Sequence, residues 1–168
     1  AAENTWDAEK HNLSEIQPES HISIMRAQFE PEDSTAETVR TGDRVNMNLT
    51  LKIHKDIDFI RIGLSVFSQL EVIVVHSLVE IEHLKPGVSL LLCKLAPIPL
   101  RAGSYPIQIR VHDKYNSCLA VIDRKDFLLR IEKQEGWDEQ SQRTSATSII
   151  DLESIWTDPV EISKGSYA

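Results

Sequence analysis

The sequence predicts an all-β protein, an antiparallel β-sandwich of the immunoglobulin-like or jelly-roll type. About seven or eight short segments with strand-like patterning follow one another at roughly ten-residue spacing, as in other sandwiches. No segment of convincing length shows a helical period. The 168 residues suffice for one domain with a proper core but not for two large ones. We therefore expect a sandwich over residues 21–159, after a linker or arm at 1–20 and before a tail at 160–168.

The strands of the first half are predicted from their alternation. A first strand is expected from His21 to Phe29, after the mostly polar residues 1–20. The clearest alternation is Val45–Ile53, whose polar parity carries two asparagines and Lys52. In the next strand, Ile60–Phe67, the apolar parity again predicts one buried face.

The segment 72–81 is apolar on both parities, apart from His76, Ser77 and Glu80. We expect either a strand covered on both faces or a strand packed against a partner subunit. A turn at 85–87 leads to a strand at 88–95. The connector that follows contains Pro97 and Pro99, which cannot lie in a central ladder.

The stretch from Leu100 to Asp113 is the most informative in the chain. A Gly-led turn leads into a strand that places Tyr105, Ile107, Ile109 and Val111 on one face, which builds the core. Pro106 predicts that the strand joins its partner only after that position, or lies at an edge. The other face carries Gln108, Arg110 and His112 in a row and is free to bind a ligand.

Three short segments complete the pattern. Strands are expected at 119–122 and 127–131, and the alternation then lapses into a polar loop. It resumes at 147–157, which predicts a late terminal strand. Such a strand either returns to its own sheet or is exchanged with a second copy of the chain.

Composition excludes several classes of function. The formal net charge of -8 argues against binding to nucleic acid or to an anionic membrane surface. No run of about 18 apolar residues and no N-terminal export signal is present, so we expect nothing that spans a membrane or is exported by itself. Cys93 and Cys118 lie in apolar, strand-like settings, which predicts two buried free thiols and favours the cytoplasm.

The motifs of enzymes and metal sites are missing. The sequence has no phosphate-binding loop, nucleophile elbow, His-Glu-x-x-His or Cys-x-x-Cys. The six histidines show no repeated close spacing, and the aspartate pairs at 56/58 and 123/126 are typical of solvated turns. We therefore expect neither catalysis nor a metal.

A carbohydrate-binding surface is the functional prediction. If the strands at 60–67, 103–113 and 127–131 share a sheet, as in immunoglobulin-like sandwiches, their arginines share its outer face. Guanidinium and amide groups beside an aromatic ring suit a sugar, and several arginines favour an anionic one. The alternatives are a solvated sheet face without a ligand, or a site on the opposite sheet with Asn46, Asn48 and His54. The predicted binding residues are Arg61, Ser65, Gln108, Arg110, His112 and Arg130, with Phe67, His76 and Tyr115 as stacking groups at the margin.

The layout resembles a known family, the C-terminal carbohydrate-binding domain of the ATP-binding subunit of Wzt-type ABC transporters, which export O-antigen polysaccharides. The resemblance covers about Ser20 to Pro159, and it depends on the order and spacing of the motifs more than on any single one. The matching motifs are Thr41-Gly-Asp, Leu100-Arg-Ala-Gly-Ser-Tyr-Pro-Ile, Phe127-Leu-Leu-Arg-Ile-Glu and Ser148-Ile-Ile-Asp-Leu-Glu-Ser-Ile-Trp156.

This resemblance implies a domain that captures the finished end of an O-polysaccharide on undecaprenyl lipid, at the cytoplasmic face of the bacterial inner membrane. It also implies a homodimer that contacts the transmembrane permease through a nucleotide-binding domain, where ATP acts. No Walker sequence precedes Ser20, so we expect this chain to be the separate module, without a cofactor. Ala146-Thr-Ser-Ile departs from the family pattern, so the resemblance leaves strand exchange open. The alternative function is an immunoglobulin-like protein-interaction or structural module.

Overall fold

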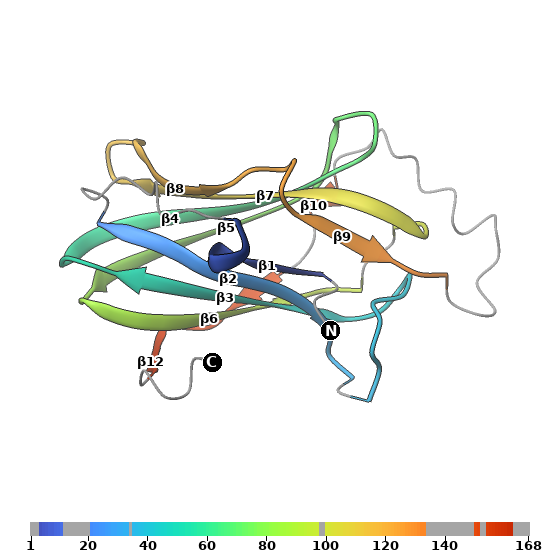
Figure 1. Cartoon of the computed structure of the whole chain (residues 1–168), viewed down its shortest axis with the longest axis horizontal. Helices are drawn as coiled ribbons and strands as arrows, with labels where there is room; N and C mark the ends of the chain where they lie inside the picture. The colour runs from blue at the N-terminus through green and yellow to red at the C-terminus, as the bar shows by residue number, and fades with distance from the viewer. Residues whose placement is uncertain are drawn as a thin grey trace.

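The computed structural model describes residues 4–11, 21–33, 35–97, 100–133, 150–151 and 154–162. They form two sheets packed face to face (Figure 1), which confirms the predicted all-β sandwich. The first sheet has the strand order β1-β2-β3-β6-β11, and β12 also pairs with β6. The second sheet has the order β10-β5-β4-β7-β8, and β9 also pairs with β7.

The strand bounds follow the alternation of the sequence closely through the centre of the chain. One short 3-10 helix, η1 (Ala8–His11), accompanies the strands. The strands are β1 (Thr5–Asp7), β2 (Ile22–Pro31), β3 (Val45–Ile53), β4 (Ile57–Phe67), β5 (Ile73–Leu84), β6 (Gly87–Leu95), β7 (Gly103–Asp113), β8 (Cys118–Ile122), β9 (Leu128–Ile131), β10 (Ile150–Asp151), β11 (Ser154–Trp156) and β12 (Val160–Ile162).

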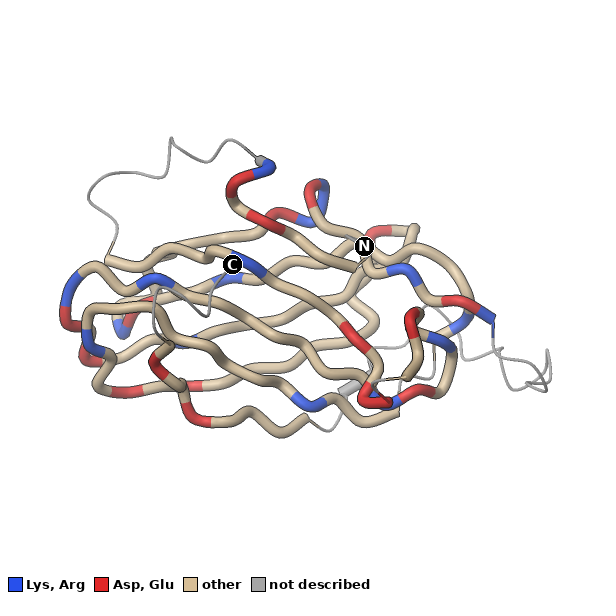
Figure 2. The backbone as a smooth tube through the Cα atoms, turned by 60° about the horizontal axis from the view of Figure 1, so that its bottom comes forward, with Lys and Arg blue, Asp and Glu red and all other residues tan. Residues whose placement is uncertain are grey.

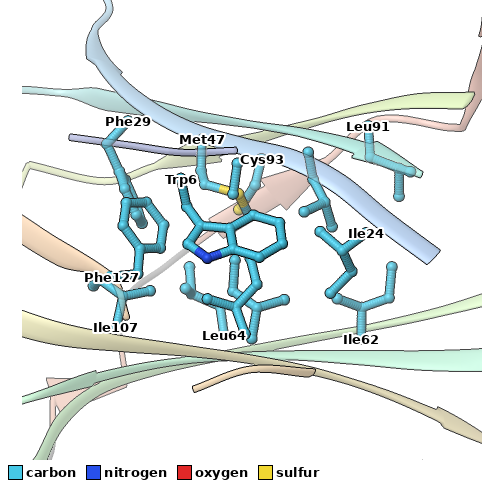
Figure 3. Packing of buried hydrophobic residues seen from close by; sticks show 14 of the residues in the cluster. Trp6, Ile24, Phe29, Met47, Ile62, Leu64, Leu91, Cys93, Ile107 and Phe127 are labelled. Atoms are coloured by element: carbon cyan, nitrogen blue, oxygen red, sulfur yellow. The ribbon is translucent and has the colours of Figure 1, made fainter. Parts of the chain in front are cut away.

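The core lies between the sheets and is built from the apolar parity of each strand. Met47 from β3 and Ile107 from β7 are fully buried, because each points from its own sheet toward the other. Phe29 and Phe127 meet with their ring centroids 5.7 Å apart and fill one end of the core (Figure 3). Burial of this apolar area is the main stabilising contribution to such a fold.

The described part of the N-terminal segment, residues 4–11, differs from the prediction of a linker or arm at 1–20, and residues 12–20 lie outside the described residues. Within that range, β1 pairs with β2, and Trp6 is only 2% exposed. Figure 3 shows the Trp6 ring between the two sheets. The Asn4 side chain also binds the edge of β9, since it accepts from the Arg130 amide at 2.6 Å and donates to the Arg130 carbonyl at 3.1 Å. The polar composition of the segment gave no sign of this docking, which depends on one large apolar side chain, Trp6, and on the hydrogen bonds of Asn4.

Strand β5 is not covered on both faces by the described residues, which contradicts the first of the two expectations for 72–81. Ser77 and Ile81 are buried, whereas His76, Leu78 and Glu80 point outward and are exposed. Leu78 is 50% exposed on this outer face, and packing of the face against a partner subunit stays a prediction.

The C-terminal strands lie along one edge of the sandwich. Strand β10 pairs with β5, while β11 and β12 both pair with β6, so this part of the chain reaches both sheets. Trp156 Nε1 donates to Ser77 Oγ at 2.9 Å, which links β11 to β5 across the sheets. Residues 160–162 of the predicted tail are a strand. Part of the predicted terminal strand, 147–149 and 152–153, lies outside the described residues.

The two cysteines are free, but only one of them is buried. Cys93 points into the core from β6, whereas Cys118 begins the outer strand β8 and is exposed. The prediction of two buried thiols was therefore wrong for Cys118, because the apolar residues around it belong to an edge strand.

Candidate functional site

The outer face of the second sheet brings together residues from β5, β4 and β7. Strand β4 is paired with both neighbours, so Arg61 lies opposite His112 on β7 and opposite Glu80 on β5. Ser65 likewise lies opposite Gln108 on β7 and His76 on β5. The strands at 60–67, 103–113 and 127–131 therefore share one sheet, as expected from sandwich topology.

Pro106 lies at the change of partners along β7. The β4–β7 ladder begins at Ile107, whereas Pro106 lies opposite Leu128 of β9. The Ile107 amide donates to the Phe127 carbonyl at 2.9 Å. The strand thus joins β4 only after the proline, as the missing proline amide requires.

Arg61 is already engaged on the protein surface. Its Nη2 and Nε lie 2.9 and 3.2 Å from Glu80 Oε1, and its guanidinium carbon lies 6.0 Å from the centre of the Phe59 ring. Because Glu80 neutralises its charge locally, Arg61 is a weaker candidate for an anionic ligand than its position alone suggests.

Ser65 and His76 form a polar pair at the centre of this face. Ser65 Oγ and His76 Nδ1 are hydrogen bonded at 3.2 Å, and the tautomer decides which atom donates. Gly63 on β4 has no side chain, so the surface of the sheet is lower at this position, beside the side chains of Leu78 and His76 on β5. The pair offers both donor and acceptor groups to a hydroxyl-rich ligand.

A hollow of about 650 Å³ lies at the end of this face. We call it the basic hollow, because Arg110, Arg124 and Lys125 lie in its wall together with only two acids. Its walls are the outer parity of β7, the turn after β4 and the turn after β8. The lining residues are Phe67, Ser68, Gln69, Glu71, Pro106, Gln108, Arg110, Asp123, Arg124 and Lys125.

Both turns that line the hollow are fixed by local hydrogen bonds. Ser68 Oγ accepts from the amides of Leu70 and Val72 at 3.2 and 3.4 Å in the β4–β5 turn. Asp123 Oδ1 accepts from the Lys125 amide at 3.1 Å, and the Asp123 carbonyl accepts from the Asp126 amide. These contacts fix the backbone of the two turns, and with it the points from which the side chains of Arg124 and Lys125 extend.

Phe67 does not present a ring to a ligand, contrary to its predicted stacking role. It is only 7% exposed, and the Arg124 guanidinium lies 5.0 Å from its ring centre. The register shift at the end of the β4–β5 ladder accompanies this inward position. Phe67 therefore supports Arg124, and Arg124 forms the wall.

The remaining predicted residues lie away from the hollow. Tyr115 is 76% exposed in the β7–β8 turn, beside the Lys114 ammonium at 5.3 Å from its ring centre. Arg130 lies opposite Ser104, about 20 Å along β7 from Arg110 by the rise per strand residue. The nine predicted residues thus belong to one sheet and its turns but not to a single pocket; of them, Phe67, Gln108 and Arg110 line the basic hollow.

Sequence reasoning missed Arg124 and Lys125. The Asp123-Arg-Lys-Asp sequence has the pattern of a turn, and no neighbouring residue in the sequence indicates that this turn lies beside β7. The order of the strands gives a usable signal. Strand β8 follows β7 directly as a hairpin, so the end of β8 returns beside Arg110. Cationic residues after such a strand are candidates for the same surface.

A second hollow of about 580 Å³ among the described residues, within 31–44, is lined by three acids and two arginines and so has no excess of positive charge. In Figure 2 basic and acidic residues alternate along the strands and turns, without a broad basic region on the described backbone. Among the residues that the structure describes, no group of three or more His, Cys, Asp or Glu could hold a metal ion. Over the same residues, no helix has the length and apolar character needed to cross a membrane.

Comparisons with known proteins agree on one family. A family model described as "Wzt C-terminal domain" matches residues 17–150. Among solved structures, the chain is similar to one described as "Crystal structure of the C-terminal domain of wzt", with a TM-score of 0.58 and 9% sequence identity over 77% of this chain and 78% of that chain. At this identity the structural likeness shows the fold alone. The comparison with curated proteins gave no match.

Proposed function

This chain belongs to the Wzt C-terminal domain family, and from this premise we propose that it is a non-catalytic carbohydrate-binding module. In this proposal the domain recognises the end of a lipid-linked O-antigen polysaccharide that is to be exported by an ABC transporter. Binding needs no cofactor in the domain, because ATP acts in a nucleotide-binding domain. The glycan is carried on undecaprenyl lipid at the cytoplasmic face of the inner membrane.

The single observation that carries the proposal is the polar outer face of the second sheet, which ends in the basic hollow. Gln108 and Arg110 stand side by side on β7 and line the hollow, and Ser65 lies opposite Gln108. The amide offers a donor and an acceptor to neighbouring hydroxyls, and the guanidinium forms a planar fork of donors. Held on rigid strands, these groups need little ordering when a sugar binds.

Arg110 is the residue on which to test the proposal. A charge-assisted hydrogen bond to a ligand contributes about 1.5 to 3 kcal/mol, so Arg110→Ala should weaken glycan binding roughly ten- to a hundredfold. The side chain is exposed, so the fold should be retained. Binding is measured on a glycan array for both proteins, followed by titration with the glycan that the wild type selects.

Lys52→Ala is the matched control for this test. Lys52 is also an exposed cation on a strand, but it lies on β3 in the first sheet. If Lys52→Ala loses binding and Arg110→Ala does not, the site belongs on the opposite sheet with Asn46, Asn48 and His54. If the wild type binds no glycan on the array, the proposed function is wrong.

A protein-interaction module is the second candidate function. Three large apolar side chains, Leu78, Val121 and Leu128, are 46–53% exposed on the same sheet. Such residues favour contact with a protein surface. Leu78→Lys separates the two functions, because it should abolish binding to a protein partner and leave glycan affinity within about twofold.

A further inference from the structure

We infer that the basic hollow selects a sugar that carries an anionic oxyacid group, either a carboxylate or a phosphate. In the absence of the sugar, the Glu71 carboxylate pairs with Arg124, and the anionic group of the sugar displaces this carboxylate when it binds. This inference deepens the proposed function and rests on it, since it names the chemistry of the glycan end. Three features carry it: the charges without partners in the wall, the guanidinium held on Phe67, and the weakness of its ion pair with Glu71.

The wall carries more positive than negative charge, since three cations and two carboxylates line it. Of these acids, Asp123 accepts from the Lys125 amide within its own turn, which fixes its carboxylate but leaves its charge. Glu71 is the partner of Arg124. Among the described residues, none forms an ion pair or side-chain hydrogen bond with the Arg110 guanidinium or the Lys125 ammonium. A ligand anion in the hollow therefore meets two cations without local partners, on strands and turns that are already fixed.

Arg124 is held in a suitable geometry by Phe67. Its guanidinium carbon lies 5.0 Å from the ring centre, in the range of a cation–π contact. The contact holds the guanidinium at the wall of the hollow. A guanidinium carries a planar fork of N–H donors, which matches two oxygens of a carboxylate or phosphate in a bidentate arrangement.

The contact between Arg124 and Glu71 is weak enough for a ligand to replace it. The nearest nitrogen and oxygen are 3.9 Å apart, and the two side chains are 40% and 77% exposed. Exposed ion pairs of this kind contribute little and are screened by salt. The Glu71 backbone has a φ of 62° and its amide donates to the Ser68 carbonyl, so the turn keeps the carboxylate near the hollow.

The hollow also has a suitable size and lining for one substituted sugar ring. A volume of about 650 Å³ lies within the usual range for small-ligand sites. Gln108 supplies an amide for hydroxyls, and Pro106 supplies an apolar surface on the same wall. The combination predicts recognition of an anionic group and of the ring that carries it.

The experiment titrates the full chain by NMR and calorimetry with defined probes. These are methyl glucuronide for a carboxylate, glucose 6-phosphate for a phosphate, methyl glucoside for the neutral sugar, and inorganic phosphate alone. We expect at least one anionic sugar to bind about tenfold or more tightly than methyl glucoside, with an affinity that falls as salt rises. Comparison of the first two probes separates carboxylate from phosphate recognition.

Two variants and one control test the roles of the wall residues. Arg124→Gln should weaken binding of the preferred anionic sugar about tenfold, while binding of methyl glucoside is unchanged. Glu71→Gln should strengthen the same binding about two- to fivefold, because it removes the competing carboxylate. Glu82→Gln removes an exposed acid from β5 on the same sheet face, outside the hollow. It should change the affinity for the anionic sugar and for methyl glucoside only by the small general effect of removing one negative charge.

Other results would contradict the inference, the role of Glu71 or the proposed function. Equal binding of neutral and anionic sugars, or equal binding of inorganic phosphate and the sugar phosphate, overturns the inference and leaves the proposed function standing if the array finds a glycan. No effect of Glu71→Gln, with anionic preference present, overturns the competing role of Glu71. Binding of no sugar in either experiment overturns the inference and the proposed function together.

Discussion

The two cysteine thiols differ in reactivity because their surroundings differ. Cys93 is fully buried, and burial raises the pKa of its thiol to about 12, against a smaller opposing effect of a hydrogen bond with Ser77. A raised thiol pKa means that almost no thiolate is present at neutral pH, and thiolate is the reactive form. Cys118 is exposed on β8.

We predict that iodoacetamide labels a single cysteine in the folded chain at mildly alkaline pH, and both cysteines after unfolding in urea. Mass spectrometry counts the labels and identifies Cys118 by peptide mapping. The control is Cys118→Ser, which should remain unlabelled until it is unfolded. Rapid labelling of Cys93 in that folded variant would show that the sheets open around β6.

At the scale of the elements, β1 illustrates how a short strand is held by one side chain. It contains three residues and pairs with β2 at the edge of the first sheet. Its hydrogen bonds alone cannot order so short a segment, because ordering costs about 1–2 kcal/mol for each residue. Trp6 lies in the core, and its burial supplies the missing stabilisation.

Trp6→Ala should therefore lower the free energy of unfolding by about 3–5 kcal/mol, the usual cost of removing a large aromatic side chain from a core. Urea denaturation followed by circular dichroism measures this change. Glu9→Ala, in the exposed part of η1, is the matched control and should change stability by less than about 0.5 kcal/mol. A similar stability for both variants would mean that β1 is not docked in solution.

At the scale of the whole molecule, the C-terminal strands give the edge of the sandwich an apolar outer surface. Ile155 on β11 and Val160 on β12 are 67% and 58% exposed. Both strands pair along β6, so these side chains lie beside the same edge. Exposed apolar groups along one edge favour association of copies, and on this ground we propose that the chain forms a homodimer.

We predict that the intact chain is a dimer by size-exclusion chromatography with light scattering, and that Ile155→Lys lowers the dimer fraction by placing a charge in the contact. Val121→Lys, at a similarly exposed apolar position on the second sheet, should leave the dimer intact. Truncation after Lys133 should weaken the dimer as well, because it removes β10, β11 and β12. A monomeric mass for the intact chain contradicts this proposal.

Local patterns in the sequence were enough to predict the fold class and the division of each central strand into two faces. Alternation along Val45–Ile53 and Tyr105–Val111 is a local property, because successive side chains of a strand point to opposite sides of a sheet. For the same reason it correctly placed Arg110 outward and Ile109 inward. Pro106 also marked the change of strand partners along β7, because a proline has no amide hydrogen to donate to a neighbouring strand, whatever its surroundings.

Contacts between distant parts of the chain determine which of these outward residues remain available to a ligand. Glu80 engages Arg61 from the neighbouring strand, Phe67 turns inward, and Arg124 comes beside Arg110 from a turn. Trp6 likewise fills the core from a segment with no strand pattern. These outcomes depend on contacts between residues far apart in the chain, which a period-two pattern does not encode, because it specifies the face of a strand but not its neighbours.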